Sequence, residues 1–411
     1  MRPAIRRLLG EDESNLFHAY TGQRVIDMKG YRWHVLFYEL MRPLVGPPIK
    51  LLLKYKPTPI PLIEGPCLVV ANHNTDFDAI LLGLAFPKHM YYVASEHIFR
   101  TRLIRALLSL FLGPIPKRKG GTDVRTAMQM ARRFRAGQSI GLFAEGNKSF
   151  HGSTCPIHPA TGSMVKASGA TLVTYRLEGG YFTSPRWGHT LRRGGMRGVP
   201  IQTYPPSELA AMTPHAINEI IARDIFEDAY ANQREHPIRY RGKRLAEGIE
   251  NALYACPRCH AFGTVRGKGD RVLCTCGLEA RYTETGMLTG TDIPFSSLQD
   301  WGDWQKTFIQ ACVREKTEAP LFSDADQTIV RIHADHRTND VAHGTLFFGR
   351  GGLTCGALHL PLSDISGLEI YGRNTIVFSD GAGNRYQVIS PAERSGLKYF
   401  DAYEIMRQGG D

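Results

Sequence analysis

The sequence predicts an α/β sandwich that carries amphipathic helices at its N-terminus and is followed by a small cysteine-rich segment and a β-rich C-terminal domain. Three observations support this prediction. Strand-like and helix-like segments alternate between residues 66 and 177, four cysteines crowd between Cys256 and Cys276, and short apolar runs fill residues 327–389. With 411 residues, of which 43% are hydrophobic and 22% charged, the chain is long enough for two or three folded domains.

The charge balance indicates an acidic partner. The net charge is +11, from 50 Lys and Arg against 39 Asp and Glu, which suits an anionic membrane, a phosphorylated substrate or a nucleic acid. Residues 1–10 contain only a two-leucine apolar run, so they do not predict a signal peptide. No stretch reaches the roughly 18 uninterrupted apolar residues of a spanning helix. We therefore expect a cytoplasmic protein that associates peripherally with a membrane.

Residues 1–60 predict two short amphipathic helices. Apolar residues recur there at helical spacing, at Leu36, Phe37, Leu40, Met41 and Leu44. Gly46-Pro47-Pro48 is expected to end the first helix, and residues 49–53 form a second one flanked by lysines. Such helices suit a bilayer interface, although the same stripe also suits packing on the protein's own core.

Residues 61–245 predict the α/β domain. The expected strands or extended pieces are residues 68–71, 90–94, 113–116, 140–143 and 171–177. The expected helices are residues 79–86, 98–112, 123–135 and 216–232. This alternation is typical of a sheet with crossover connections.

His73 and Asp78 directly follow the first of these strands. A carboxylate five residues after the histidine can begin the next helix and fold back on the imidazole. If Asp78 holds one ring nitrogen, the other nitrogen is available as a general base. Alternatively, His73 caps the helix and Asp78 pairs with the helix dipole, and the spacing alone does not distinguish the two interpretations.

Two further polar loops follow strands. Residues 117–119, Lys-Arg-Lys, precede two glycines and suit a bound phosphate, although a solvated run of charge has the same appearance. In residues 143–149, Gly146 allows a ligand to approach the backbone, and Glu145 and Lys148 supply opposite charges. Taken singly, this second loop is an ordinary polar turn.

Taken in order, these motifs resemble the glycerophospholipid acyltransferase family, which includes the 1-acylglycerol-3-phosphate acyltransferases. The motifs are His73-x4-Asp78, Gly113-x4-Arg118 and Phe143-x-Glu145-Gly146-x2-Ser149, and the resemblance covers roughly residues 62–199. It implies a catalytic dyad of His73 and Asp78. It also implies that the acyl acceptor's phosphate and glycerol are bound by Arg118, Glu145, Gly146, Asn147 and Lys148.

The third motif departs from the family pattern. Ala144, Asn147 and Lys148 stand where the family commonly has Pro, Thr and Arg. Lysine keeps the positive charge but lacks the bidentate fork of arginine, so the identity of the acceptor stays open. Residues 179–199, rich in Gly, Arg and aromatic residues, suit a loop that contacts lipid headgroups or the donor's phosphates, or a flexible solvated loop.

The resemblance implies transfer of a fatty acyl chain from acyl-CoA or acyl carrier protein to the free hydroxyl of a lysophospholipid. The acceptor it implies is 1-acylglycerol 3-phosphate, which would give phosphatidic acid. Two other functions are compatible with the sequence: a zinc-ribbon protein that binds nucleic acid, and a catalytically silent lipid-binding scaffold. Basic residues are spread along the whole chain and the ribbon has few aromatic residues for stacking, which argues against nucleic acid.

The cysteines predict a structural zinc site in residues 246–292. Cys256 and Cys259 form a C-x-x-C pair, and Cys274 and Cys276 form a second pair that is one residue tighter. Four thiolates would make a closed tetrahedral Zn²⁺ site, which stabilises a segment too small for a core of its own. The segment resembles a zinc ribbon.

Residues 293–411 predict the β-rich domain. A helix over residues 297–313 is followed by seven short strands and a last helix over residues 392–406. In pattern this resembles a pleckstrin-homology-like or GRAM-like module. No basic phosphoinositide signature is present, so a structural or protein-contact role is expected.

Overall fold

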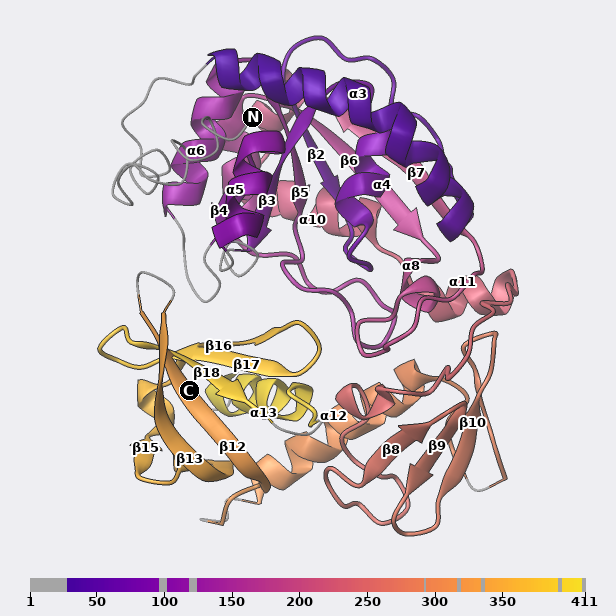
Figure 1. The fold of residues 1–411 in the computed structure, drawn as a ribbon, viewed down its shortest axis with the longest axis vertical. Coiled ribbons are helices and arrows are strands. Elements are labelled where there is room, and N and C mark those ends of the chain that lie inside the picture. Colours follow the sequence, from indigo (N-terminus) through magenta and orange to yellow (C-terminus); the bar gives the residue numbers. More distant parts are fainter. Residues whose placement is uncertain are drawn as a thin grey trace.

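The structure is a computed structural model that describes residues 28–95, 102–117, 124–291, 293–315, 319–333, 337–390 and 394–408. An α/β unit lies above two smaller units, a four-stranded one and a β-rich C-terminal one, which lie side by side (Figure 1). Among the residues described, no helix has both the length and the apolar composition that crossing a bilayer requires.

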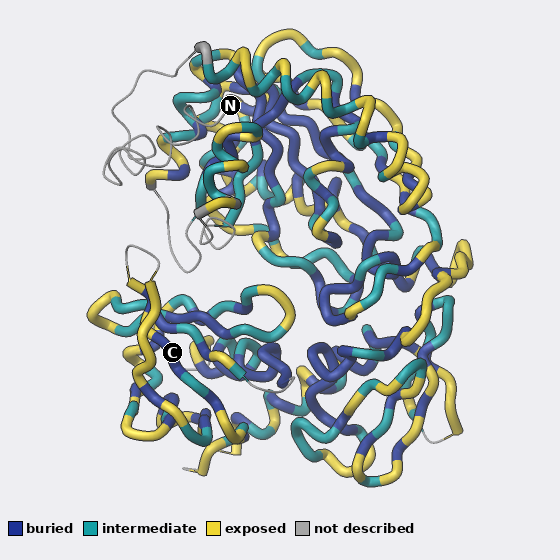
Figure 2. Tube along the Cα trace, viewed as in Figure 1, coloured by how far each residue is buried: buried dark blue, intermediate teal, exposed yellow. Residues whose placement is uncertain are grey.

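The α/β unit is built on a seven-stranded sheet in the order β1-β7-β6-β2-β5-β3-β4. Only the β6–β7 pair is antiparallel, and the other pairs are parallel. Central strand β2 is buried along its whole length, as expected for a strand covered on both faces (Figure 2). The strands are β1 (Tyr55–Pro57), β2 (Cys67–Ala71), β3 (Met90–Ser95), β4 (Ile115–Lys117), β5 (Ser139–Phe143), β6 (Thr171–Glu178) and β7 (Met196–Tyr204). The predicted α/β fold is confirmed.

The helices that follow the strands are mostly where the sequence places them. They are α4 (Asp78–Ala85), α5 (Arg102–Phe111), α6 (Val124–Arg135), α7 (Thr161–Ser168), α8 (Gly180–Thr183), α9 (Pro206–Ala211), α10 (Pro214–Ile225) and α11 (Ala229–Glu235). The prediction of a single helix over residues 216–232 is wrong, because the helical conformation is interrupted between α10 and α11. Asp228 accepts a hydrogen bond from the Ala231 N–H at 2.8 Å and so starts a new helix there.

The predicted end of the first amphipathic helix at Gly46-Pro47-Pro48 is also wrong. One helix, α3 (Met28–Leu53), continues through these prolines, while residues 1–27 lie outside the described part of the chain. Side chains of α3 bind carbonyls on and beside α4: Tyr38 donates to Gly83 at 2.5 Å and Arg42 donates to Leu84 at 3.1 Å. These long-range bonds offset the hydrogen bonds that the prolines remove.

The cysteine-rich unit is a four-stranded antiparallel sheet preceded by a short 3-10 helix, η2 (Ile249–Asn251). Its strands are β8 (Val265–Lys268), β9 (Arg271–Cys274), β10 (Glu279–Tyr282) and β11 (Leu288–Thr289). Helix α12 (Leu298–Arg314) leads from this unit into the C-terminal one.

The C-terminal unit is a seven-stranded antiparallel sheet closed by a helix, so the predicted β-rich character is confirmed. Its strands are β12 (Phe322–Ile332), β13 (Thr338–Gly349), β14 (Gly352–Cys355), β15 (Leu358–Leu360), β16 (Ser366–Tyr371), β17 (Thr375–Ser379) and β18 (Arg385–Ile389). Between β15 and β16 lies η3 (Leu362–Asp364), and α13 (Leu397–Gln408) packs on α12. Its assignment to a pleckstrin-homology-like or GRAM-like module stays a prediction.

The segment between β6 and β7 lies inside the molecule. Trp187 and Arg192 are fully buried, and Trp187 belongs to a hydrophobic core that continues into both smaller units. The Arg192 guanidinium donates to the Leu245 carbonyl at 2.5 Å and lies over the Trp187 ring. The interpretation of residues 179–199 as a flexible solvated loop is therefore wrong. Arg193 and Arg197 of this segment are nevertheless exposed, and its contact with lipid headgroups or the donor's phosphates stays a prediction.

Candidate active site

His73 and Asp78 meet at the carboxyl edge of the central sheet. The Nδ1 of His73 lies 2.8 Å from Oδ2 of Asp78, and the imidazole stacks on the Phe143 ring with centroids 4.7 Å apart. The His73 side chain is 27% exposed, and no hydrogen bond from another described residue occupies its Nε2. The ring is therefore oriented at one nitrogen and accessible at the other.

Asp78 is held more tightly than the histidine it orients. It is completely buried in the first turn of α4, where the helix dipole favours a carboxylate. Its Oδ2 also accepts from the N–H groups of Asn74 (2.6 Å) and Thr75 (2.8 Å), and its Oδ1 accepts from the Thr75 hydroxyl (2.6 Å). Asp78 thus lies in the first turn of α4 and also orients His73, whereas His73 does not cap the helix, whose N-cap residue is Phe77.

Glu145, two residues after the end of β5, binds the loop that contains His73 (residues 72–77, the histidine loop). Its Oε1 accepts from the His73 N–H at 2.6 Å, and its Oε2 accepts from the Cys155 N–H at 2.5 Å. Burial raises the pKa of Glu145 to about 8 despite these two hydrogen bonds. Both carboxyl oxygens bind backbone of this protein, so the geometry gives Glu145 a positioning role beside the acceptor-binding role that the resemblance implies.

The rest of this turn faces solvent next to the dyad. Gly146 has a φ of +70°, which favours glycine, and a side chain there would meet open space. The Lys148 ammonium pairs with Asp76 of the histidine loop at 2.6 Å. Asn147 lies in the same turn, half-buried. Arg118 lies outside the described residues.

Glu227 is a site residue that the sequence did not predict. It lies fully buried in the break between α10 and α11. Its Oε2 accepts from the side-chain amides of Asn74 (2.5 Å) and Asn72 (3.3 Å), and its Oε1 accepts from the Gly179 N–H (2.9 Å). Glu227 thereby ties the histidine loop to the end of β6. The sequence signal for the interruption between α10 and α11 is Asp228, a residue type that commonly caps the N-terminus of a helix.

The part of the chain that contains His73 and Asp78 matches a known protein family. Residues 53–178 match the family model described as Acyltransferase. This part of the chain is similar to the acyltransferase family. Among solved structures, the chain is similar to the 1-acyl-sn-glycerophosphate acyltransferase PlsC from Thermotoga maritima, with 16% identity and a TM-score of 0.37 over 51% of this chain and 85% of that one.

Some residues of the candidate site lie inside the matched part of the chain, and others lie beyond it. His73, Asp78, Glu145 and Lys148 lie inside the residues that match the family model. Glu227, which binds the histidine loop, lies about 50 residues beyond the end of the matched part, and the four clustered cysteines lie about 80 to 100 residues beyond it.

The two buried glutamates make stability depend on pH. Burial raises the pKa of Glu227, like that of Glu145, from 4.5 to about 8. The folded state therefore keeps protons that the unfolded state has lost, and the free energy of unfolding should fall as pH rises from about 4.5 to about 8. Urea unfolding between pH 5 and 9 should show a smaller fall for Glu227→Gln than for the wild type. An equal fall in that variant and in the exposed control Glu208→Gln would contradict this assignment.

Arg186 connects the α/β unit to the C-terminal unit. Its buried guanidinium donates to three backbone carbonyls, of Lys148 (2.9 Å), Ile370 (2.9 Å) and Gly372 (2.8 Å). One of these carbonyls belongs to the turn beside the dyad, and the other two belong to the β16–β17 hairpin. The neighbouring Arg373 donates back to the Gly188 carbonyl at 2.9 Å. The C-terminal unit is thus fastened to the backbone of the candidate site.

Replacing Arg186 with Met should destabilise the whole chain. The change keeps most of the side-chain volume but leaves three carbonyls without their charged donor, which we expect to lower the free energy of unfolding by about 3 kcal/mol. Urea unfolding followed by tryptophan fluorescence measures this loss. The exposed Arg281, substituted in the same way, is the matched control. Equal stability of the two variants would show that the Arg186 contacts are dispensable.

Four cysteine thiols converge in the second unit. The Sγ atoms of Cys256, Cys259, Cys274 and Cys276 all lie within 4.8 Å of one another. The Cys256–Cys276 and Cys259–Cys274 separations are 3.7 and 3.8 Å, and tetrahedral Zn–S bonds of about 2.3 Å require about 3.8 Å between sulfurs. The second pair, although one residue tighter, therefore supplies its two thiols with suitable spacing, and the cluster could hold a metal.

The backbone and His260 support this geometry. Gly277, just after the second pair, has a φ of +88°, a left-handed conformation that lets the chain turn behind the thiols. The His260 ring packs against Trp304 and Phe308, with centroids 5.9 and 5.3 Å away, rather than among the thiols. All four candidate ligands are thus cysteines.

Proposed function

We propose that the protein is an O-acyltransferase that moves an acyl chain from an acyl thioester to the free hydroxyl of a lysophospholipid, most directly 1-acylglycerol 3-phosphate. The observation that carries this proposal is the orientation of His73. Its Nδ1 is fixed by a buried carboxylate and its Nε2 is accessible, within a domain that matches the acyltransferase family.

The proposed chemistry needs no covalent enzyme intermediate. His73 Nε2 takes the proton of the acceptor hydroxyl as the hydroxyl oxygen attacks the thioester carbonyl. The C–S bond then breaks, and the proton passes from Nε2 to the leaving thiolate. Asp78 keeps the Nδ1–H tautomer and stabilises the imidazolium that forms between the two proton transfers.

The acceptor's phosphate is proposed to bind on the β5 side of His73. Lys148 lies there, and its partner Asp76 is exposed, so a phosphate can compete for the ammonium. Arg118 is proposed to contribute to the same site on the strength of the sequence motif.

A panel assay tests the proposed function. The purified full-length chain is incubated with lysophospholipids of different headgroups and with either acyl-CoA or acyl carrier protein thioester, and products are identified by mass spectrometry. Phosphatidic acid from 1-acylglycerol 3-phosphate is the expected product. If both thioesters stay intact with every acceptor, the catalytically silent scaffold replaces this proposal.

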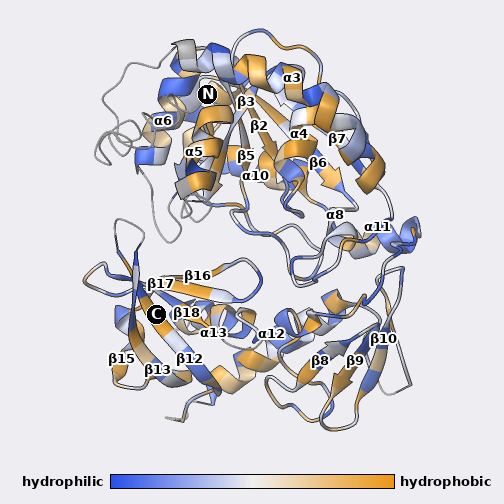
Figure 3. Cartoon of the chain, in the orientation of Figure 1, coloured by the Kyte–Doolittle hydropathy of each residue, from blue (hydrophilic) through white to orange (hydrophobic). Residues whose placement is uncertain are grey.

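We further propose that helices α3 and α5 bind the surface of an anionic membrane, so that the protein is cytoplasmic and peripheral. Figure 3 shows hydrophobic residues along both helices. The two helices contact each other, since the Trp33 indole donates to the Leu110 carbonyl at 2.8 Å. The exposed apolar residues of this surface are Trp33, Leu36, Leu40, Leu44, Leu51, Leu103, Leu107 and Leu110. Arg32 and Lys50 are also exposed on α3 and suit acidic headgroups.

Charged substitutions on this surface should weaken membrane binding. The double variant Leu40→Glu, Leu44→Glu removes two apolar contacts and adds two negative charges, so binding to phosphatidylglycerol-containing vesicles should fall at least about tenfold. Vesicle co-sedimentation measures the change. The control, Phe347→Glu with Ile389→Glu, alters two exposed apolar residues of the C-terminal sheet. If both double variants bind vesicles as the wild type does, the α3–α5 surface is not the membrane-binding face.

A further inference from the structure

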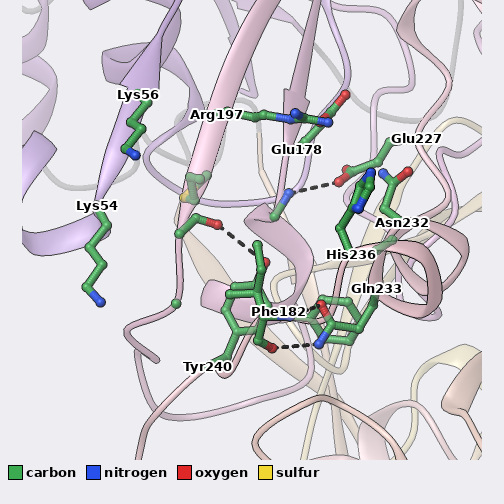
Figure 4. Close-up of a pocket in the computed structure, with 16 residues that line it drawn as sticks. Lys54, Lys56, Glu178, Phe182, Arg197, Glu227, Asn232, Gln233, His236 and Tyr240 are labelled. Atoms are coloured by element: carbon green, nitrogen blue, oxygen red, sulfur yellow. Dashed lines mark hydrogen bonds and ion pairs between the residues drawn. The ribbon is translucent and has the colours of Figure 1, made fainter.

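A pocket of about 400 Å³ is lined by Lys54, Lys56, Glu178, Phe182 and Glu227, among other residues (Figure 4). It is formed by residues of β1, β6, β7, α8 and α11 and the segments next to them. Its volume is in the range of small-molecule sites, about 300 to 1,000 Å³. Nothing in the chemistry proposed above uses this pocket.

The pocket adjoins the dyad through one shared residue. Glu227 lines the pocket and also accepts the hydrogen bond from Asn74, the residue after His73. The strand order explains this arrangement. His73 follows β2, Lys148 follows β5 on one side of β2, and the pocket lies at the ends of β6, β7 and β1 on the other side. Two substrates could therefore approach His73 from opposite sides.

The charges of the pocket favour an anionic ligand. Lys54 and Lys56 are exposed at its edge, and neither makes an ion pair with another described residue. Of the two acidic residues, Glu178 is neutralised by Arg176 and Arg197. Burial raises the pKa of the other, Glu227, to about 8, which reduces its negative charge near neutral pH. Two lysines are thus left without a counter-charge.

Further inside, the lining is apolar with a few amide groups. Phe182, Met196 and Ile238 supply the apolar surface. The side chain of Asn232 lies next to Glu227 and makes no hydrogen bond to any described residue. A Cβ added at Gly195 would meet no atom within 4 Å, so this wall has open space in front of it. The pocket suits a ligand with a phosphate at one end and a neutral, amide-containing chain.

We propose that this pocket binds the phosphopantetheine arm of the acyl donor, with its phosphate at Lys54 and Lys56 and its thioester end directed to His73. The arm is common to acyl-CoA and acyl carrier protein, so the proposal holds for either donor. It rests on the proposed acyltransferase function and adds to it a separate donor site on the β6–β7 side of the dyad.

Two variants test the pocket by different means. Gly195→Leu fills it without displacing a neighbour, and Lys54→Gln with Lys56→Gln removes the phosphate partners. Their matched controls are Gly351→Leu, where a Cβ also meets open space, and Lys243→Gln with Lys268→Gln, two exposed lysines elsewhere. Titration calorimetry with CoA and with holo acyl carrier protein measures binding without turnover and shows which carrier is preferred.

Both pocket variants should weaken binding of the preferred carrier by about tenfold, and the controls should not. The donor KM should rise in parallel while the KM of the lysophospholipid stays unchanged. Unchanged carrier binding in both variants overturns the pocket assignment, and activity of the wild type then still supports the proposed function. Conversely, variant-sensitive carrier binding without transfer to any acceptor keeps the pocket and rejects the function. A change in preferred acyl-chain length alone would assign the pocket to the acyl chain instead.

Discussion

Replacing His73 with Gln should lower kcat for acyl transfer by about 100- to 10,000-fold, the range that general-base catalysis contributes. Glutamine keeps a polar group that can reach Asp78 but cannot take a proton at neutral pH. The Asp78 carboxylate keeps its three other hydrogen bonds, to Asn74 and Thr75, so the loop should stay folded. Phosphatidic acid formation, followed by thiol release at saturating donor and acceptor, measures the loss.

The matched control is His215→Gln, a highly exposed histidine on α10 of the same unit. Both variants should unfold at the same temperature as the wild type, because neither change removes a buried apolar contact. Asp78→Asn should also reduce kcat, since an amide can hold the imidazole in the wrong tautomer. Wild-type turnover by His73→Gln would rule out His73 as the base.

The strand before the dyad, the helix after it and the contact between His73 and Asp78 could be predicted because their signals are local. His73 and Asp78 are five residues apart, and the strand before them and the helix after them have strong apolar patterns. The 2.8 Å contact between them needs only the turn at the start of α4. Glu227 could not be predicted in this way. It lies 153 residues from Asn74, and its role depends on a helix break that apolar periodicity does not show.

The burial of two arginines is a further feature that could not be predicted from the sequence. Arg186 and Arg192 look like surface charges in a glycine-rich segment, yet both are buried with backbone carbonyls as partners. Every residue type has a backbone carbonyl, so a buried arginine that binds carbonyls has no partner residue that the sequence pattern could indicate. The prolines of α3 were misleading for a related reason, since contacts with α4 decide that the helix continues.

Replacing Cys256 with Ser should remove a bound zinc ion and destabilise the chain. All four sulfurs lie within 4.8 Å of one another and two of their separations are 3.7 and 3.8 Å, close to those of a tetrahedral site, so one Zn²⁺ per chain is expected in protein purified without chelator. Metal binding contributes about 10 to 16 kcal/mol to the folding of zinc-finger peptides, so loss of a ligand should lower the Tm by at least about 5 °C. Metal analysis by mass spectrometry and a thermal scan measure the two effects.

Loss of the metal should also affect the α/β unit, because this unit and the cysteine-rich unit share a hydrophobic core. Cys256 lies in the hydrophobic core that contains Trp187, and Arg192 donates to Leu245 and to the Tyr282 hydroxyl at the edge of the cysteine-rich unit. Loss of the metal should therefore reduce acyl transfer through partial unfolding, whereas His73→Gln should lower kcat by about 100- to 10,000-fold and keep the metal. The control is Cys312→Ser, a thiol on α12 outside the cluster. If Cys256→Ser retains the wild-type Tm and the protein contains no metal, the cluster is not a structural zinc site.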